Sequence, residues 1–167
     1  DDNAKRKGEM NKSKHPTFNF YEDLFEEICA LDTLRKAFKL VKRNKGAPGI
    51  DGITIAKYEE NLPEELNQLR NEVMSWSYKP TPVKRVEIPK PNGKGVRLLG
   101  IPIVKDRVLH MAIKMVLEPI LDPTFSQNSF AFRPGRNQQQ AVKQAQKIVQ
   151  SGKEFVVDID LSKFFDR

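Results

Sequence analysis

Apolar side chains recur at intervals of three and four residues in five stretches of this chain. This spacing predicts five helices, each with one buried face. Pro63 interrupts the third of them, which is expected over 55–76, and Asn137 with Gln140 offers a capping box at the start of the fifth, which Gly152 ends. Asp32 or Thr33 is the expected cap of the second. The periodic positions are Leu24, Phe25, Ile28 and Leu31; Leu34, Phe38 and Val41; Leu66, Leu69, Val73 and Met74; Val104, Val108, Met111, Ala112, Met115 and Val116; and Ala141, Ala145, Ile148 and Val149.

Other stretches favour strands. Residues 82–89 and 95–101 flank the turn residues Pro91-Asn92-Gly93, which predicts a β-hairpin. Phe130 and Phe132 alternate as in a half-buried strand, and the apolar run Val156–Leu161 predicts a short buried strand. The mixture of helices with local hairpin pairing is typical of the α+β class.

The net charge of the chain indicates what kind of partner it binds. The 167 residues carry 29 Lys and Arg against 22 Asp and Glu, a net charge of +7. This balance favours a polyanion such as RNA. The single cysteine, Cys29, is expected to be a small buried residue in a reducing compartment. No apolar run is long enough to cross a bilayer, so no membrane association is expected.

Asp160 ends the predicted strand, and two interpretations of it compete. It could cap a helix that starts at Leu161, or it could bind Mg²⁺ at a phosphoryl-transfer site, because Mg²⁺ prefers carboxylate oxygen. Asp158 falls on the same face by alternation and is expected to be structural.

Two loops carry further candidate chemistry. Lys45–Gly52, KGAPGIDG, holds three glycines and a proline in eight residues, which predicts a tight loop defined by its backbone. Ser129–Arg136, SFAFRPGR, combines aromatic and arginine side chains, as single-strand binding sites often do. A plain loop with solvated arginines is the alternative there. The basic hairpin could likewise be only an edge protected by lysines.

These motifs together resemble a known family. Asp160 followed five positions later by Phe165, with GAPGIDG and FAFRPGR upstream, is similar to the reverse transcriptases encoded by bacterial group II introns, also called maturases. The resemblance runs from about Leu24 to Arg167. It implies an α+β fold with a helical amino-terminal extension, β-hairpin fingers and the partial palm of a right-hand polymerase. The implied divisions are a flexible basic arm over 1–18, the extension over 19–77, the fingers over 78–153 and the start of the palm over 154–167.

The same resemblance implies roles for individual residues. Asp160 would be catalytic and would bind two Mg²⁺ or Mn²⁺ ions, with the backbone carbonyl of Leu161 as a further metal ligand. The incoming nucleotide would contact Lys90, with Lys94 as a rival, and also Arg97 and Phe165. The residues implied for template or intron RNA are Gly49, Asp51, Lys105, Arg107, Arg133, Pro134, Gly135 and Arg136.

The implied function is RNA-directed DNA polymerisation, a nucleotidyltransferase reaction that copies RNA into DNA for intron mobility, together with help in splicing. Expected partners are group II intron RNA, an RNA template with a DNA primer, and dNTP, in a cytoplasmic ribonucleoprotein. The family's Ala-Asp-Asp turn is not found in this sequence, so these residues alone are expected to be inactive and to dimerise through an incomplete palm. A basic RNA-binding module without catalysis is the alternative, as is a retron, diversity-generating or CRISPR-associated reverse transcriptase.

Overall fold

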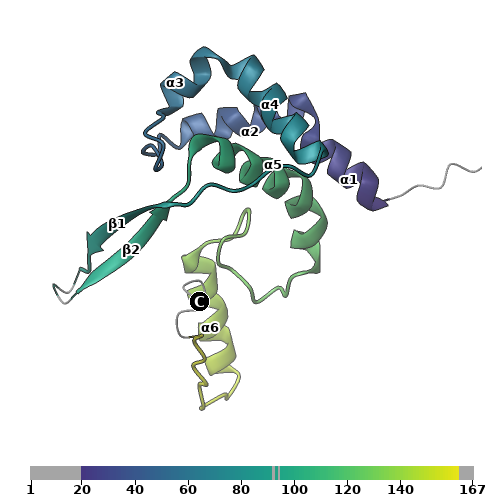
Figure 1. Ribbon diagram of the computed structural model, residues 1–167. Helices are drawn as coiled ribbons and strands as arrows, with labels where there is room; N and C mark the ends of the chain where they lie inside the picture. The colour runs from purple at the N-terminus through teal and green to yellow at the C-terminus, as the bar shows by residue number, and fades with distance from the viewer. Residues whose placement is uncertain (1–19, 92, 94, 162–167) are drawn as a thin grey trace, which may run out of the picture. The chain divides into compact units, whose positions relative to one another are not determined.

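The computed structural model describes residues 20–91, 93 and 95–161. The chain divides into two compact units, one ending at Leu117 and the other starting at Glu118. The first unit contains helices and one small antiparallel sheet, and the described residues of the second contain helices, which together confirm the predicted α+β class (Figure 1). The expected divisions at 77/78 and 153/154 stay predictions, and the arm over 1–18 lies outside the described residues. In chain order the elements are α1 (Phe20–Cys29), α2 (Leu31–Arg43), α3 (Ile55–Glu60), α4 (Leu62–Met74), β1 (Lys84–Pro89), β2 (Val96–Ile101), α5 (Val104–Leu121), the 3₁₀ turn η1 (Asp122–Thr124) and α6 (Gln138–Gln150).

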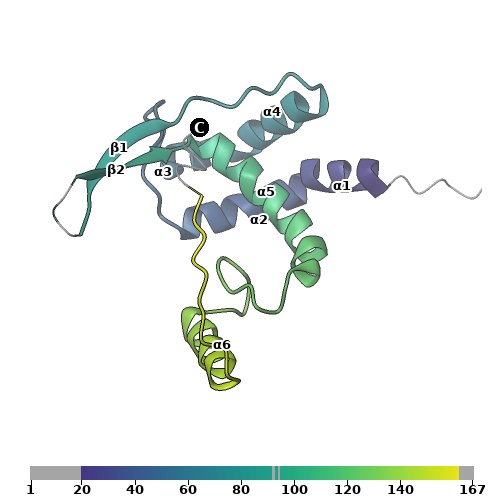
Figure 2. The same cartoon turned by 90° about the horizontal axis from the view of Figure 1, so that it is seen from below.

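The core of the first unit lies between α2, α3, α4 and the first half of α5 (Figures 1 and 2). The predicted apolar faces meet there, because helices that each carry one apolar stripe must bury it against one another. Phe38 stacks on Tyr58 with ring centroids 5.9 Å apart. Cys29 is buried, as expected. The buried residues of this cluster are Leu34, Ala37, Phe38, Val41, Tyr58, Leu66, Leu69, Val104, Val108, Leu109 and Ala112.

Helix boundaries follow local chemistry. Pro63 stands in the first turn of α4, where its missing N–H costs nothing, and the predicted interruption therefore separates α3 from α4. At the start of α6 the predicted capping box is present between Asn137 and Gln140, and Gly152 adopts φ +89° just after the helix. The expected cap of α2 was wrong: Ala30 precedes that helix, and Asp32 pairs with Arg35 inside its first turn.

The predicted hairpin is confirmed. Strands β1 and β2 pair antiparallel from Lys84↔Ile101 to Pro89↔Val96. Gly100 lies against Val83, whose Cγ2 atom is 2.8 Å from where a β-carbon on Gly100 would stand. Side chains on both faces are exposed, including Ile88 and Leu98. This hairpin projects from the helices that precede and follow it (Figure 1).

The two other predicted strands are wrong. Phe132 lies in a turn with φ +57° and is fully exposed, because the loop around it is drawn together by Arg133. Residues 153–161 have no strand pairing, and Val156 and Ile159 are more than 80% exposed instead of buried. A strand needs a neighbour for its backbone N–H and C=O groups, and the described part of the chain places none beside this segment. Of the helices that the structure describes, none has the length and apolar character needed to cross a bilayer.

Candidate functional site

The hairpin presents the two cations predicted to contact a nucleotide. The Lys90 N–H donates to the Gly95 carbonyl over 3.1 Å, which continues the strand register by one pair beyond Pro89↔Val96. Arg97 stands opposite Ile88. Alternation therefore places Lys90 and Arg97 on the same face, as diagonal neighbours about 7–8 Å apart. Both side chains are exposed, so this face can offer two positive charges to one polyphosphate. Lys94 lies outside the described residues.

A buried carboxylate holds the root of the hairpin. Asp106, in the first turn of α5, is 2% exposed. Its Oδ1 accepts a hydrogen bond from Tyr78 Oη at 2.6 Å, and its Oδ2 accepts from the Thr81 N–H at 3.0 Å. Burial, and then the hydrogen bond to Asp106, raise the pKa of the Tyr78 phenol. The segment that leads into β1 is thereby fixed to α5.

Lys105, predicted to contact template, forms an ion pair within the protein. Its Nζ lies 2.5 Å from Glu72 Oε2 of α4, and both side chains are mostly covered. This hydrogen bond lowers the pKa of the Glu72 carboxyl. The pair joins α4 to α5 next to Asp106.

The glycine-rich loop, residues 45–52, is pressed against the start of α5. A β-carbon on Gly49 would stand 2.7 Å from the backbone N and Cα of Ile103, so no larger residue fits there without displacement. Arg107 Nη2 donates to the Ala47 carbonyl at 2.9 Å, and burial lowers the pKa of its guanidinium, an effect that nearby Asp51 opposes. The Asp51 carboxylate accepts from the Ile53 N–H at 3.1 Å.

These contacts bring together three of the residues predicted to contact template, Gly49, Asp51 and Arg107, whereas Lys105 pairs with Glu72 of α4. Each of the three polar side chains has a partner within the protein. Arg107 Nε is buried without a hydrogen-bond partner in the described structure. The loop and the first turns of α5 therefore form one preorganised surface.

Arg133 organises the FAFRPGR loop in the second unit. Its side chain is 6% exposed, and all five N–H groups of its guanidinium donate within the chain. Nε and Nη2 bind the Asp122 carboxylate at 2.7 and 3.3 Å, and Nη2 also binds the Asp122 carbonyl. Nη1 binds the Ser126 and Ser129 carbonyls. The Arg133 guanidinium, with all its donors used, therefore connects Asp122 at the start of the loop to the residues around Arg133.

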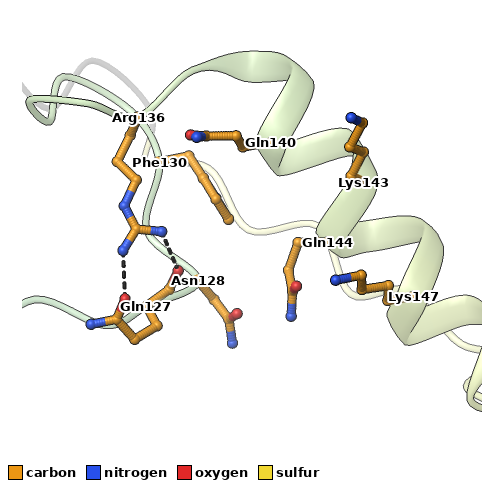
Figure 3. A pocket seen from close by; sticks show the side chains of 8 residues that line it. All are labelled: Gln127, Asn128, Phe130, Arg136, Gln140, Lys143, Gln144 and Lys147. Carbon is orange, nitrogen blue, oxygen red and sulfur yellow. Dashed lines mark hydrogen bonds between the residues drawn. The ribbon is translucent and has the colours of Figure 1, made fainter.

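Arg136 is also partly buried. It donates to the Gln127 carbonyl at 3.1 Å and to the Gln127 side-chain Oε1, and its Cζ lies 5.4 Å from the Phe130 ring centroid (Figure 3). Pro134 precedes Gly135, which has φ +68°, a conformation that glycine adopts without strain. The turn thus directs Arg133 to Asp122 and Arg136 to Gln127.

Asp160 and Leu161 are exposed in the segment after α6. Among the described residues, no group of three or more His, Cys, Asp and Glu side chains gathers that could hold a metal ion. These residues by themselves do not fit a site for two divalent ions. Phe165 lies outside the described residues.

Two structural carboxylates were missed from sequence. Asp106 lies on the side of α5 opposite the predicted stripe of Val104 and Val108, so the apolar pattern did not mark it as buried. Asp122 looked like part of an Asp-Pro turn, and nothing in the pattern linked it to Arg133, eleven residues later.

Comparison with known proteins finds a family model that matches the second half of the chain. Residues 88–167 match the family model described as "Reverse transcriptase (RNA-dependent DNA polymerase)". The match covers β2, α5, the FAFRPGR loop, α6 and the segment with Asp160. Residues 88–167 are therefore similar to reverse transcriptases.

Individual relatives refine this assignment. "Protein YkfC" of Escherichia coli (strain K12) is 38% identical over 149 residues, which are 86% of this chain and 39% of that protein. "Group II intron-encoded protein LtrA" of Lactococcus lactis subsp. cremoris is 31% identical over 145 residues, which are 86% of this chain and 24% of that protein. "Nuclear intron maturase 1, mitochondrial" of Arabidopsis thaliana is 53% identical over 36 residues, 22% of this chain and 5% of that protein.

The predicted resemblance to group II intron-encoded reverse transcriptases is thus confirmed. The chain spans well under half the length of these relatives.

Proposed function

We propose that this chain supplies the fingers and the first part of the palm of an RNA-directed DNA polymerase that serves a group II intron. The supporting observation is that Lys90 and Arg97 share one exposed face of a hairpin whose root is fixed by Asp106. Arginine suits bidentate phosphate contacts and lysine acts as a point charge, so this face would hold the triphosphate of an incoming dNTP.

Steady-state kinetics of the whole protein test the nucleotide face. Arg97→Ala and Lys90→Ala should each raise the KM for dNTP about tenfold or more, the loss expected for one charged hydrogen-bonding partner. Arg85→Ala is the matched control, because Arg85 pairs with Gly100 on the opposite face of the same hairpin. If Arg85→Ala raises the KM for dNTP by the same factor, nucleotide binding depends on the total charge of the hairpin and not on which face carries it.

Asp160 would contribute one carboxylate to a site for two Mg²⁺ or Mn²⁺ ions in the whole protein, with the Leu161 carbonyl beside it and Phe165 under the sugar. Such ions stabilise the attacking and leaving oxygens of phosphoryl transfer. Asp160→Asn should abolish nucleotide incorporation while RNA binding persists, and Asp158→Asn is the control. Incorporation that survives Asp160→Asn contradicts this role and favours an RNA-binding module without catalysis.

Template and intron RNA would contact the surface formed by Gly49, Asp51 and Arg107, the separate residue Lys105, and the loop Arg133–Arg136. In this proposal Arg133 shapes the loop for Pro134 and Gly135, and Arg136 reaches the RNA. RNA bound to the chain should dissociate as salt rises, because each phosphate contact releases a counterion. The working form would be a cytoplasmic ribonucleoprotein with intron RNA, RNA template and DNA primer.

A homodimer is also proposed. Phe155, Val156, Val157, Ile159 and Leu161 are strongly exposed, and an unpaired β-favouring segment invites pairing with a second copy. Light scattering should give twice the monomer mass, and Val157→Lys should restore the monomer. A monomer at all concentrations for the unchanged chain contradicts the proposal.

A further inference from the structure

A surface groove lies within the first unit, between α1 and the carboxyl end of α4. Its volume is about 600 Å³, within the range of pockets that hold ligands. None of the residues that line it has been given a role in nucleotide or RNA binding. They are of two chemical kinds, large apolar or aromatic side chains and carboxylates: Tyr21, Glu22, Phe25, Glu26, Met74 and Trp76.

Trp76 is the centre of the aromatic part of the groove. Its ring stacks on Phe25 of α1, with ring centroids 5.2 Å apart and planes 4° from parallel. Trp76 is nevertheless 83% exposed, so this stack covers one face of the indole and leaves the other face to solvent. Met74, which is also exposed, adds a flexible thioether side chain that can adapt to the shape of a ligand. The groove therefore presents an open indole face beside an adaptable apolar side chain.

The backbone holds Trp76 in an unusual conformation. Trp76 directly follows Ser75, the C-cap of α4, and has φ +57°, where glycine is the usual residue. The N–H groups of Ser77 and Tyr78 both donate to the Glu72 carbonyl, at 3.0 and 2.9 Å, and fix this turn. A bulky residue at positive φ is uncommon, and such strained residues cluster at binding sites. Glycine would serve the turn as well, so the turn does not account for an exposed indole.

Carboxylates form the other part of the groove. Helix α1 carries Glu22, Asp23, Glu26 and Glu27 and no lysine or arginine, although the whole chain has a net charge of +7. Among the described residues, none of these four carboxylates forms an ion pair. Glu22 and Glu26 line the groove, are exposed and lie four residues apart, so their Cβ atoms stand about 5–6 Å from each other. This acidic face repels phosphates and attracts cations.

An arginine side chain matches both parts of the groove. Its planar guanidinium stacks on an indole face and can bind a carboxylate through two N–H groups, which an ammonium cannot do. Its aliphatic stem can lie along Met74. In an extended chain, alternate residues point to the same side about 6.5–7 Å apart, a spacing comparable to that of Glu22 and Glu26. Two arginines separated by one residue therefore fit the groove.

We propose that this groove docks a partner protein through an extended segment of the form Arg-x-Arg. One guanidinium would stack on the open face of Trp76, and the two arginines would pair with Glu22 and Glu26. Docking goes beyond the proposed function, since it requires neither a nucleotide nor RNA. RNA and a second copy of this chain are the competing occupants.

Binding is measured by fluorescence anisotropy on the full chain, with a labelled peptide of about ten residues in which arginine and serine alternate. Glu22→Gln/Glu26→Gln should weaken binding about fivefold or more, because it removes two ion-pairing partners. Asp23→Asn/Glu27→Gln is the matched control, since it removes the same charge at the same spacing from exposed positions of α1 outside the groove. This control should weaken binding less than about twofold, because salt screens charges that the peptide does not contact. Equal losses would show that the peptide responds only to the total charge of α1, and would overturn the proposal.

Trp76→Gly tests the stacking contact separately from charge. It should weaken peptide binding about fivefold or more. The thermal midpoint should stay close to that of the unchanged chain, because glycine relieves the positive φ while the contact with Phe25 is lost. Unchanged binding with a lowered midpoint would assign Trp76 to stability alone and overturn the proposal. A peptide with lysine in place of arginine should bind more weakly, and equal binding of the two peptides would contradict stacking of the guanidinium.

The Glu22→Gln/Glu26→Gln variant also tests the competing occupants. Its affinity for a labelled oligouridylate should be unchanged or higher, because the lost carboxylates repel phosphates; weaker RNA binding would assign the groove to RNA and overturn the proposal. Its sedimentation should match that of the unchanged chain, and loss of a dimer would assign the groove to a second copy. Circular dichroism shows whether α1 is retained. Polymerase assays on Asp160 and Arg97 variants decide the proposed function independently of these results.

Discussion

Tyr78 Oη donates a 2.6 Å hydrogen bond to Asp106 Oδ1 across 28 residues of sequence. The other oxygen of the same carboxylate accepts from the backbone of Thr81. One buried side chain therefore connects the start of α5 to the segment that enters the hairpin. The position of Lys90 and Arg97 depends on this connection, although neither touches Asp106.

Asp106→Asn should destabilise the first unit by about 2 kcal/mol, because a charged acceptor of two hydrogen bonds becomes a neutral group that also carries donors. Urea unfolding followed by circular dichroism measures the change. Tyr78→Phe removes only one of the two bonds and should cost less. In the whole protein, Asp106→Asn should also raise the KM for dNTP, and an unchanged KM would separate the hairpin root from nucleotide binding.

Tyr58→Phe should leave stability unchanged or raise it by up to about 1 kcal/mol, because the Tyr58 hydroxyl is buried without a hydrogen-bond partner in the described structure. Tyr78→Phe, where the hydroxyl has a partner, should lower it. Urea midpoints of the two variants provide the comparison. A large loss for Tyr58→Phe would reveal an unrecognised partner for that hydroxyl.

Stability should fall at alkaline pH. Burial raises the pKa of Tyr58 and Tyr78 above the ordinary value near 10. The folded state holds these phenol protons more tightly than the unfolded state, so the contribution is complete below about pH 10 and is lost progressively above it. Urea unfolding at several alkaline pH values measures the loss, and Tyr58→Phe should flatten it. An equally steep loss in that variant would assign the effect to other groups.

Gly49→Ala should destabilise the first unit by about 2 kcal/mol, since its new methyl group would meet the Ile103 backbone at 2.7 Å. Gly46→Ala is the matched comparison. Its methyl group would fall on the Arg107 guanidinium, the end of a side chain that can move. It should therefore cost less, and thermal unfolding of both variants checks the order. The reverse order would show that the Arg107 contact is the more rigid of the two.

Arg133→Lys should loosen the loop over 122–137, because an ammonium cannot replace five donors in a planar fork. Arg133→Lys should therefore increase the rate of amide hydrogen exchange in that loop, and Arg136→Lys should increase this rate less. The loop should also open in acid: the bond from Arg133 lowers the pKa of the Asp122 carboxyl, so its contribution is present above the ordinary value near 3.8 and is lost as pH falls below it. Exchange rates that do not respond to Arg133→Lys contradict this role.

Local features were predictable from sequence. Leu34, Phe38 and Val41 lie on one helical face whatever the partner is, and they are buried as expected. The capping box of Asn137 and Gln140 spans three residues, and the hairpin register is set by its own turn. Such features depend on neighbours in the chain, which the pattern contains.

Features that depend on distant partners were missed. The alternation of Phe130 and Phe132 is too short to distinguish a strand from a turn, and Arg133 decides the outcome through Asp122. Val156–Leu161 has strand-forming residues, but pairing needs a neighbour that sequence pattern does not supply. The partners of Arg107 and Lys105 could not be foreseen either, since Ala47 and Glu72 come from other elements.

The reciprocal bonds between Asn137 and Gln140 fix where α6 begins and, with it, the phase of the whole helix. Each residue of an α-helix advances the side-chain direction by about 100°. Lys143 and Lys147 line one pocket with Arg136 (Figure 3). Inserting one residue after Gln140 would turn both lysines away from Arg136 without altering a single charge. The capping box, by fixing the first residue of α6, thus also fixes the direction in which Lys143 and Lys147 point.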